Sequence, residues 1–426
     1  MEKTETAFTN AIVKGDRKRG MNDLRIPEIQ KNENFVYLRD GWYLGALFPA
    51  ILTIIIYLGL NPEEFHSDLF TRITRVYGGF VVFMVFLWLL GVNFIVWKKL
   101  KINYIFIFEL DPRHHIDIPN YFEFVAILSC LVGYSYVAFL FNLGAPTMGP
   151  EYHPIILLGV FLLVLFFPFP IFYRQSRFWL IKELWKIATA PFYKVEFADF
   201  MLGDQICSLV YVILSLQYTI CLYLPSSSPG GICDQHQGVL TIILASLPSW
   251  FRLMQCFRRY RDLRASAHLL NAVKYFSAIM VVVCSGLNRI FGNGISLSFW
   301  IVAAVFSLIY SSLWDIMRDW SLFQKGARHK LLRNSLFYPW PWVYYVAIPL
   351  DVVLRSAWVV TLSENPANPN LRDFFLALAE VYRRFQWNFF RLENEHVNNV
   401  GKFRAVKEVP LPATFLQHTD ALDAGK

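Results

Sequence analysis

The stretch YGGFVVFMVFLWLLGVNFIVW, residues 77–97, decides the fold class of this protein. It runs for 21 residues without a charged side chain. About 20 mainly apolar residues are enough for one α-helix to cross the hydrocarbon core of a membrane. The stretch therefore predicts a membrane-spanning helix.

Nine further segments follow the same rule, so the sequence predicts an all-α, polytopic membrane protein with about ten transmembrane helices. They are residues 43–60, 120–142, 154–173, 203–224, 238–256, 271–288, 296–315, 341–362 and 373–391. The composition agrees, because only 17% of the 426 residues are charged and 55% are hydrophobic, whereas a soluble domain carries about 25% charge. These figures also exclude a disordered chain and a disulfide scaffold.

The Lys and Arg residues between the predicted spans are distributed unevenly. The five connections on one side contain only Arg72, Arg75 and Arg289, and the segments on the other side contain 30: residues 1–40, 97–119, 174–198, 257–268, 316–335 and 392–426. Cytoplasmic flanks of membrane helices hold the excess of positive charge. We therefore expect both termini in the cytosol. The same pattern explains the net charge of +8 without a nucleic-acid partner.

This division predicts five regions: a cytosolic tail at 1–40, four peripheral membrane helices in 41–173, an interfacial helix in 174–196, a helical core in 197–391 that carries the candidate site, and a second cytosolic tail at 392–426. The interfacial helix is expected because Lys182, Glu183 and Lys186 share one face, while aromatic and aliphatic side chains lie largely elsewhere.

Seven Lys and Arg residues remain within or beside the predicted spans. Arg372 and Arg391 lie near helix ends, where a long side chain can extend to the interface, and Arg252 is open to the same interpretation. Lys274 lies at the inner mouth. The other three, Arg355, Arg383 and Arg384, lie close to mid-span. An arginine there costs about 2.5–3.5 kcal/mol, so the three together cost on the order of 8–10 kcal/mol unless compensated.

Two acids share helical faces with the mid-span arginines, since Asp351 precedes Arg355 by four residues and Glu380 lies three and four residues before Arg383 and Arg384. Three arginines against two acids leave an excess of guanidinium groups, which suits a tetrahedral oxyanion such as phosphate or sulfate. The alternative is a set of structural ion pairs that lock the last two spans together. Trp358 is open to a gating or a packing role.

Other residues give weaker signals. The six cysteines are scattered singly, and only Cys221 and Cys233 could meet on the outer side to form a disulfide. The neighbouring His114 and His115 have no further ligands nearby, so no metal site and no cofactor are expected. A membrane enzyme acting on a lipid phosphate is disfavoured, because no His lies in the spans beside the arginines.

Six motifs resemble a known family, the EXS domain of eukaryotic phosphate exporters of the xenotropic and polytropic retrovirus receptor type. They are FADFMLGDQ at 197–205, WFRLMQCFRRYRD at 250–262, HLLNAVKY at 268–275, WDIMRDW at 314–320, DVVLRSAW at 351–358 and RRFQWNFFRLENEH at 383–396. The resemblance implies a ten-helix homodimer without enzymatic activity, which lets inorganic phosphate leave the cytosol through a pore in the later helices.

The family's functional positions carry over to ten residues, most of them already selected by charge. Phosphate contact is implied for Asp204, Arg264, Lys274, Arg355, Arg383 and Arg384, and a pathway or gating role for Asp315, Asp319, Trp358 and Glu380, to which the charge pattern adds Asp351. The expected partners are inorganic phosphate, membrane lipids and a second copy of the chain.

One departure concerns the amino-terminal region. Longer family members begin with a cytosolic SPX domain that binds inositol pyrophosphates, whereas about 40 residues precede the first span here. Regulation by inositol pyrophosphates is therefore not carried over. Shorter yeast relatives act in the Golgi, so the plasma membrane and the Golgi membrane both stand as locations. Golgi phosphate recycling or sorting, and a membrane scaffold held by ion pairs, are the alternative functions.

Overall fold

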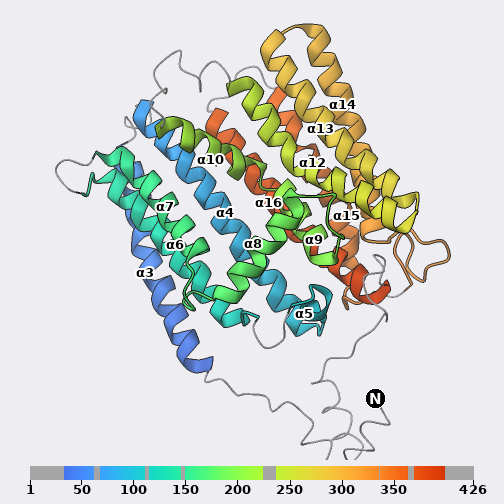
Figure 1. Ribbon diagram of the computed structural model, residues 1–426, viewed down its shortest axis with the longest axis horizontal. Coiled ribbons are helices and arrows are strands. Elements are labelled where there is room, and N and C mark those ends of the chain that lie inside the picture. Colours follow the sequence, from blue (N-terminus) through green and yellow to red (C-terminus); the bar gives the residue numbers. More distant parts are fainter. Residues whose placement is uncertain are drawn as a thin grey trace, which may run out of the picture.

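The computed structural model describes residues 33–61, 68–110, 115–144, 149–223, 237–334, 336–362 and 369–398. The described residues form helices and no strand, which confirms the all-α prediction (Figure 1). The helices of the first half are α3 (Glu33–Leu60), α4 (Asp68–Lys99), α5 (Tyr104–Ile107), α6 (Ile118–Leu140), η2 (Pro150–Tyr152), α7 (His153–Phe166), α8 (Arg174–Ala188), α9 (Phe197–Cys207) and α10 (Val210–Tyr223). The second half contains α12 (Gln237–Leu263), α13 (Ala267–Phe291), α14 (Gly294–Trp314), η3 (Asp315–Asp319), α15 (Pro341–Arg355), η4 (Ser356–Leu362) and α16 (Pro369–Asn398).

Seven helical segments of the described chain are long and apolar enough to cross a membrane: Tyr37–Leu60, Phe70–Lys99, Ile118–Leu140, Gly238–Leu263, Ala267–Phe291, Gly294–Asp319 and Pro341–Leu362. The pair α9 and α10 makes an eighth crossing if it counts as one span, although its two halves meet at an angle of 66°. The chain is thus a multi-pass membrane protein. The count of ten and the cytosolic termini remain predictions.

The predicted span 154–173 is shorter in the structure, because α7 ends at Phe166. Pro168 and Pro170 follow directly and cannot continue a helix. The open carbonyl groups at this end are bound by Arg177, which is 5% exposed and donates hydrogen bonds to the carbonyls of Val164, Leu165, Phe167, Ile171 and Phe172.

The helix α16 departs from the apolar rule in its composition and not in its length. It has 30 residues and is long enough to cross a membrane, but its sequence is too polar to face lipid. In Figure 1 it lies between two groups of helices, with α3, α4, α6 and α7 on one side and α12, α13 and α14 on the other. It packs on α4, α10 and α15, so neighbouring helices shield its charges.

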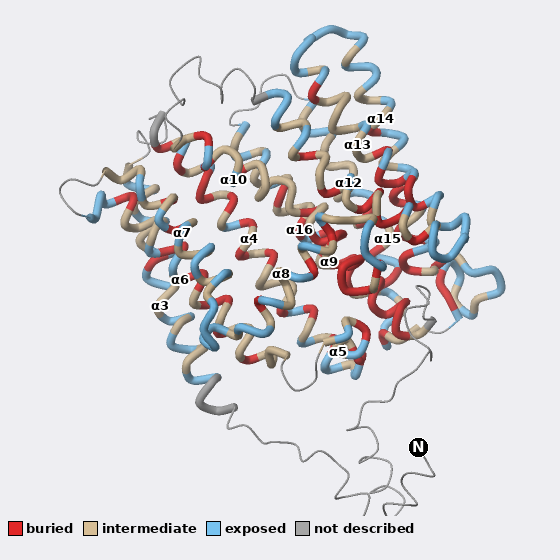
Figure 2. Tube along the Cα trace, in the orientation of Figure 1, coloured by how far each residue is buried: buried red, intermediate tan, exposed pale blue. Residues whose placement is uncertain are grey.

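Burial follows the same arrangement (Figure 2). Only 6% of the apolar window of α3 and 11% of that of α14 are buried, and their exposed residues include Trp42, Phe48, Phe299 and Phe306. Eight of the eleven residues of α9 are buried. The outer helices therefore present apolar side chains to lipid, while α9 and α16 form the interior that holds the polar residues.

Candidate functional site

The short helix α9 carries an aspartate into the interior. Asp204 is 2% exposed and accepts hydrogen bonds from Arg252 Nε of α12 at 2.9 Å and from the Tyr275 hydroxyl of α13 at 2.6 Å. Arg252 Nη2 also donates to the Tyr275 hydroxyl at 2.8 Å. Gly203 permits this approach, since a Cβ there would lie 2.6 Å from Arg252 Cδ. Asp204 thus joins α9 to α12 by an ion pair and to α13 by a hydrogen bond.

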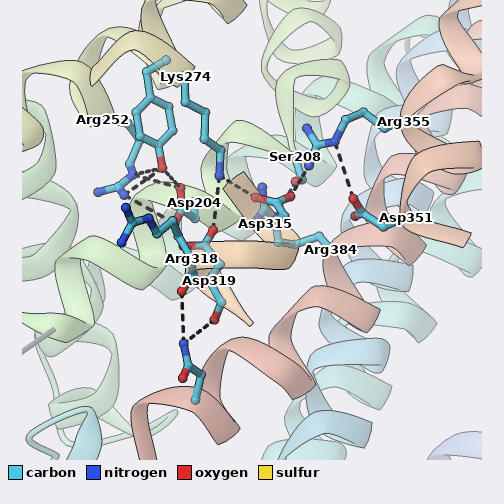
Figure 3. A network of polar contacts seen from close by, with 12 residues as sticks. Asp204, Ser208, Arg252, Lys274, Asp315, Arg318, Asp319, Asp351, Arg355 and Arg384 are labelled. Carbon is cyan, nitrogen blue, oxygen red and sulfur yellow. Dashed lines mark hydrogen bonds and ion pairs between the residues drawn. The ribbon is translucent and has the colours of Figure 1, made fainter. Parts of the chain in front are cut away.

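Two further aspartates face Lys274 of α13. Lys274 Nζ lies 2.6 Å from Asp315 Oδ1 and 3.3 Å from Asp319 Oδ2 (Figure 3). Both acids belong to η3, a single π-helical turn at the end of α14, in which the Trp320 amide donates to the Asp315 carbonyl at 2.8 Å. Such turns are rare in proteins, and those that do occur are often found at functional sites. The wider turn places both carboxylates on one ammonium group.

Asp315 also connects to the last two helices. Its Oδ2 contacts Arg355 of α15 directly and lies 3.5 Å from Arg383 Nη1 of α16. Asp351, fully buried one turn before Arg355, lies 3.2 Å from Arg383 Nη1 and 3.7 Å from Arg355 Nε. Asp315 and Asp351 therefore neutralise two of the three mid-span arginines together.

The remaining arginine has a different environment. Glu380 forms a bidentate pair with Arg383, at 2.7 and 2.8 Å, and accepts a hydrogen bond from the Ser208 hydroxyl at 2.7 Å. Arg384, which is 6% exposed, donates from Nε to Ser208 Oγ at 2.8 Å and lies over the ring of Trp387 at 4.5 Å. No carboxylate among the described residues lies at ion-pair distance from Arg384. Arg384 therefore reaches Glu380 only through the Ser208 hydroxyl and makes no direct ion pair within the described residues.

We call these groups the charge cluster. It contains five cations, Arg252, Lys274, Arg355, Arg383 and Arg384, and five carboxylates, Asp204, Asp315, Asp319, Asp351 and Glu380. The formal charges balance. This differs from the excess of three arginines over two acids suggested by the sequence, because Asp315 arrives from another helix and pairs with Arg355 and Arg383.

Two of the predicted site residues lie apart from this cluster. Arg264 is exposed in the turn between α12 and α13, with a φ of +52°. Trp358 lies in η4 and packs against Trp300 of α14, with ring centroids 5.9 Å apart. The structure brings the other nine predicted residues together.

Sequence reasoning did not select three residues of the site, which are Arg252, Ser208 and Tyr275. Arg252 was open to an interfacial interpretation, but it is fully buried against Asp204 and Phe200, so that interpretation is wrong. Arg391 likewise does not reach the interface, since it is 4% exposed and pairs with Glu395 at 3.2 Å. Ser208 and Tyr275 carry no charge and gave no signal alone, although Arg252 and Tyr275 fall within family motifs.

The cysteine prediction is settled for five of the six residues. Cys130, Cys207, Cys256 and Cys284 are free, whereas Cys221 is disulfide-bonded. Its candidate partner Cys233 lies outside the described residues, as do His114 and most of the two tails.

The helices and the charge cluster define an integral, multi-pass membrane protein whose interior is built around ion pairs. Comparison with known proteins then gives the family: the EXS family profile matches residues 73–397. The chain belongs to the EXS family, which confirms the resemblance seen in its motifs.

Curated relatives support the same assignment. The chain is 38% identical over 438 residues to the xenotropic and polytropic retrovirus receptor 1 homolog of Danio rerio, covering 96% of this chain and 63% of the relative. It is 37% identical over 440 residues to solute carrier family 53 member 1 of Homo sapiens, covering 96% and 62%. The chain thus spans somewhat less than two thirds of the relatives' length.

Proposed function

We propose that this chain moves inorganic phosphate across a membrane, out of the cytosol, through the charge cluster. The observation that carries this proposal is the guanidinium of Arg384, which makes no direct ion pair to a described carboxylate although it is buried beside Arg383 and within the same network as Arg355 and Lys274. A buried charge without an ionic partner is costly. An anion that binds there would remove that cost, which gives the position a function that a purely structural ion pair lacks.

The remaining charges suit passage rather than tight retention. Guanidinium groups can replace the water hydrogen bonds of a phosphate oxygen, two at a time. The carboxylates of Asp315, Asp351 and Glu380 compete with phosphate for the same arginines and weaken its binding, as conduction requires. Glu380 and Arg355 form the accessible edge of the cluster, with side chains 35% and 17% exposed. We propose that phosphate enters at this edge.

The family comparison supports transport as the class of activity. Curated relatives carry the name solute carrier, and the relation is to a family of transporters rather than of enzymes. The choice of phosphate rests on the motif resemblance and on the chemistry of the arginines.

Phosphate efflux from proteoliposomes tests the proposal. Arg384→Ala removes one charged donor worth about 1.5–3 kcal/mol, so we expect efflux to fall by about tenfold or more, since 1.4 kcal/mol corresponds to a factor of ten. Arg372→Ala is the matched control on the same helix. Arg372 pairs with the exposed Asp373 at its outer end, 2.9 Å away, and efflux should stay near that of the unmodified protein.

Unchanged efflux in a folded Arg384→Ala variant would contradict the proposal. A second contrast separates it from the scaffold alternative, which the balanced charges of the cluster favour. If the cluster is only structural, Arg355→Lys keeps an ion pair to Asp315 and leaves efflux intact. If Arg355 binds phosphate with its planar fork, the same change lowers efflux.

A further inference from the structure

The break between α9 and α10 lies at the centre of the site, next to Glu380 and Arg384 of α16. Ser208 follows the last residue of α9, and α10 starts at Val210. Ser208 is 4% exposed. Its hydroxyl group donates to Glu380 Oε1 at 2.7 Å and accepts from Arg384 Nε at 2.8 Å. The Ser208 hydroxyl thus lies between the carboxylate of Glu380 and the guanidinium of Arg384.

The position of Ser208 matters because Glu380 has two arginines within reach on its own helix. Residues three and four positions apart are neighbours on a helix surface, so Glu380 can pair with Arg383, with Arg384 or with both. The structure shows both carboxylate oxygens on Arg383, at 2.7 and 2.8 Å. Ser208 occupies the space on the Arg384 side.

The amino-terminal end of α10 adds to the positive potential there. The first backbone bond of α10 runs from the Ile213 amide to the Leu209 carbonyl at 3.1 Å, so the amides of its first turn have no helical acceptor. That end of a helix carries about half a positive charge. In broken membrane helices such ends face anionic substrates. Arg384, 94% buried and bound to the residue at the break, brings its own charge to the same place.

We propose that Ser208 is a positioning residue that keeps Arg384 available to the transported anion, by holding Glu380 and Arg384 apart at the amino-terminal end of α10. Without the hydroxyl, Glu380 moves toward Arg384, neutralises it and competes with the anion. Ser208 therefore acts through Arg384. This inference rests on the proposed transport of phosphate and names a residue that sets its affinity.

A double-mutant cycle tests this role. We expect Ser208→Ala to raise the phosphate concentration for half-maximal efflux by about tenfold, equal to 1.4 kcal/mol. In a Glu380→Gln background the same change should have less than about a twofold effect, because a neutral amide cannot neutralise Arg384. Ser208→Thr keeps the hydroxyl and should restore most of the affinity. Thr219→Val, which removes a buried hydroxyl bonded to the Ser215 carbonyl farther along α10, is the matched control and should leave affinity unchanged.

The outcomes separate this inference from the transport proposal. An equal loss from Ser208→Ala in both backgrounds, no loss at all, or a loss in Ser208→Thr as large as in Ser208→Ala would overturn the role of Ser208. If the unmodified protein passes no phosphate, the transport proposal fails, and the cycle is then read from the rise in melting temperature that phosphate or sulfate gives the detergent-solubilised protein. If neither anion stabilises the unmodified protein, both proposals fail.

Discussion

At the scale of single residues, Arg252 shows how the fold tolerates charge inside a membrane. It is fully buried, and its guanidinium is enclosed by Asp204, Tyr275, Gln255 and the ring of Phe200. Every one of these partners comes from α9, α12 or α13. The pair is therefore a contact between helices, and its loss should be felt as instability rather than as altered transport alone.

We expect Arg252→Leu to destabilise the protein by about 3–5 kcal/mol, because it leaves the Asp204 carboxylate buried without its ionic partner. Adding Asp204→Asn removes that charge and should recover a large part of the loss. Denaturant or thermal unfolding in detergent measures both variants. If the double variant is no more stable than Arg252→Leu, the cost is one of packing, and the ion-pair explanation is wrong.

At the scale of elements, α7 shows how a helix of 14 residues, too short to cross a membrane, can be terminated by a neighbouring helix. Its last carbonyl groups have no helical donor, and Arg177 of α8 supplies donors to five carbonyls between Val164 and Phe172. A planar guanidinium suits this task because it presents five N–H groups in a fixed geometry.

Arg177→Ala should therefore destabilise the protein by on the order of 3 kcal/mol, since five carbonyls lose a charged donor at once. Arg177→Lys should recover little, because one ammonium group cannot reach carbonyls spread from Val164 to Phe172. Arg174→Ala, an exposed arginine one turn earlier on α8, is the control and should change stability by less than about 0.5 kcal/mol. Equal melting temperatures for Arg177→Ala and Arg174→Ala would contradict this account.

The hydrophobic pattern predicted where most helices lie, because the length of an apolar run is local information. Segments 77–97 and 271–288 fall within α4 and α13, and segment 120–142 overlaps α6 up to its last residue, Leu140. The break in the predicted span 203–224 was missed, since Ser208, Leu209 and Val210 include neither proline nor glycine. The bend at Ser208 accompanies contacts with α16, about 170 residues away in sequence, and such contacts leave no local pattern.

The candidate site was predicted in part for the same reason. Mid-span arginines are visible in sequence because their cost is set by position alone. Partners on the same helix are visible from their spacing, but partners on other helices are not, as Asp315 shows: it lies in another helix from Arg355 and Arg383 yet contacts both. Tertiary pairing changed an apparent excess of charge into a balanced cluster in which Arg384 is the one cation without a direct ion pair to a described carboxylate.

At the scale of the whole molecule, the uneven distribution of Lys and Arg between the predicted connections implies one orientation of the chain in the membrane. The proposed direction of phosphate transport through the charge cluster assumes this predicted orientation, with both termini in the cytosol. The exposed residues Arg289, at the end of α13, and Lys325, after η3, lie on opposite sides of α14 in sequence. Because α14 is long and apolar enough to cross the membrane once, the 30-to-3 distribution of Lys and Arg predicts that Lys325 lies on the cytosolic side and Arg289 on the other.

Sealed microsomes, whose cytosolic face points outward, test this orientation with an impermeant maleimide. We expect Lys325→Cys to react at once and Arg289→Cys to react only after detergent is added. The unmodified chain gives the background, to which the four cysteines that are free in the described part of the chain contribute. The reverse order would place the termini outside the cytosol and would turn the proposed phosphate path around. Reaction of both variants from the same side would mean that α14 does not cross, and the charge cluster at its η3 end would then lie at a membrane surface instead of inside.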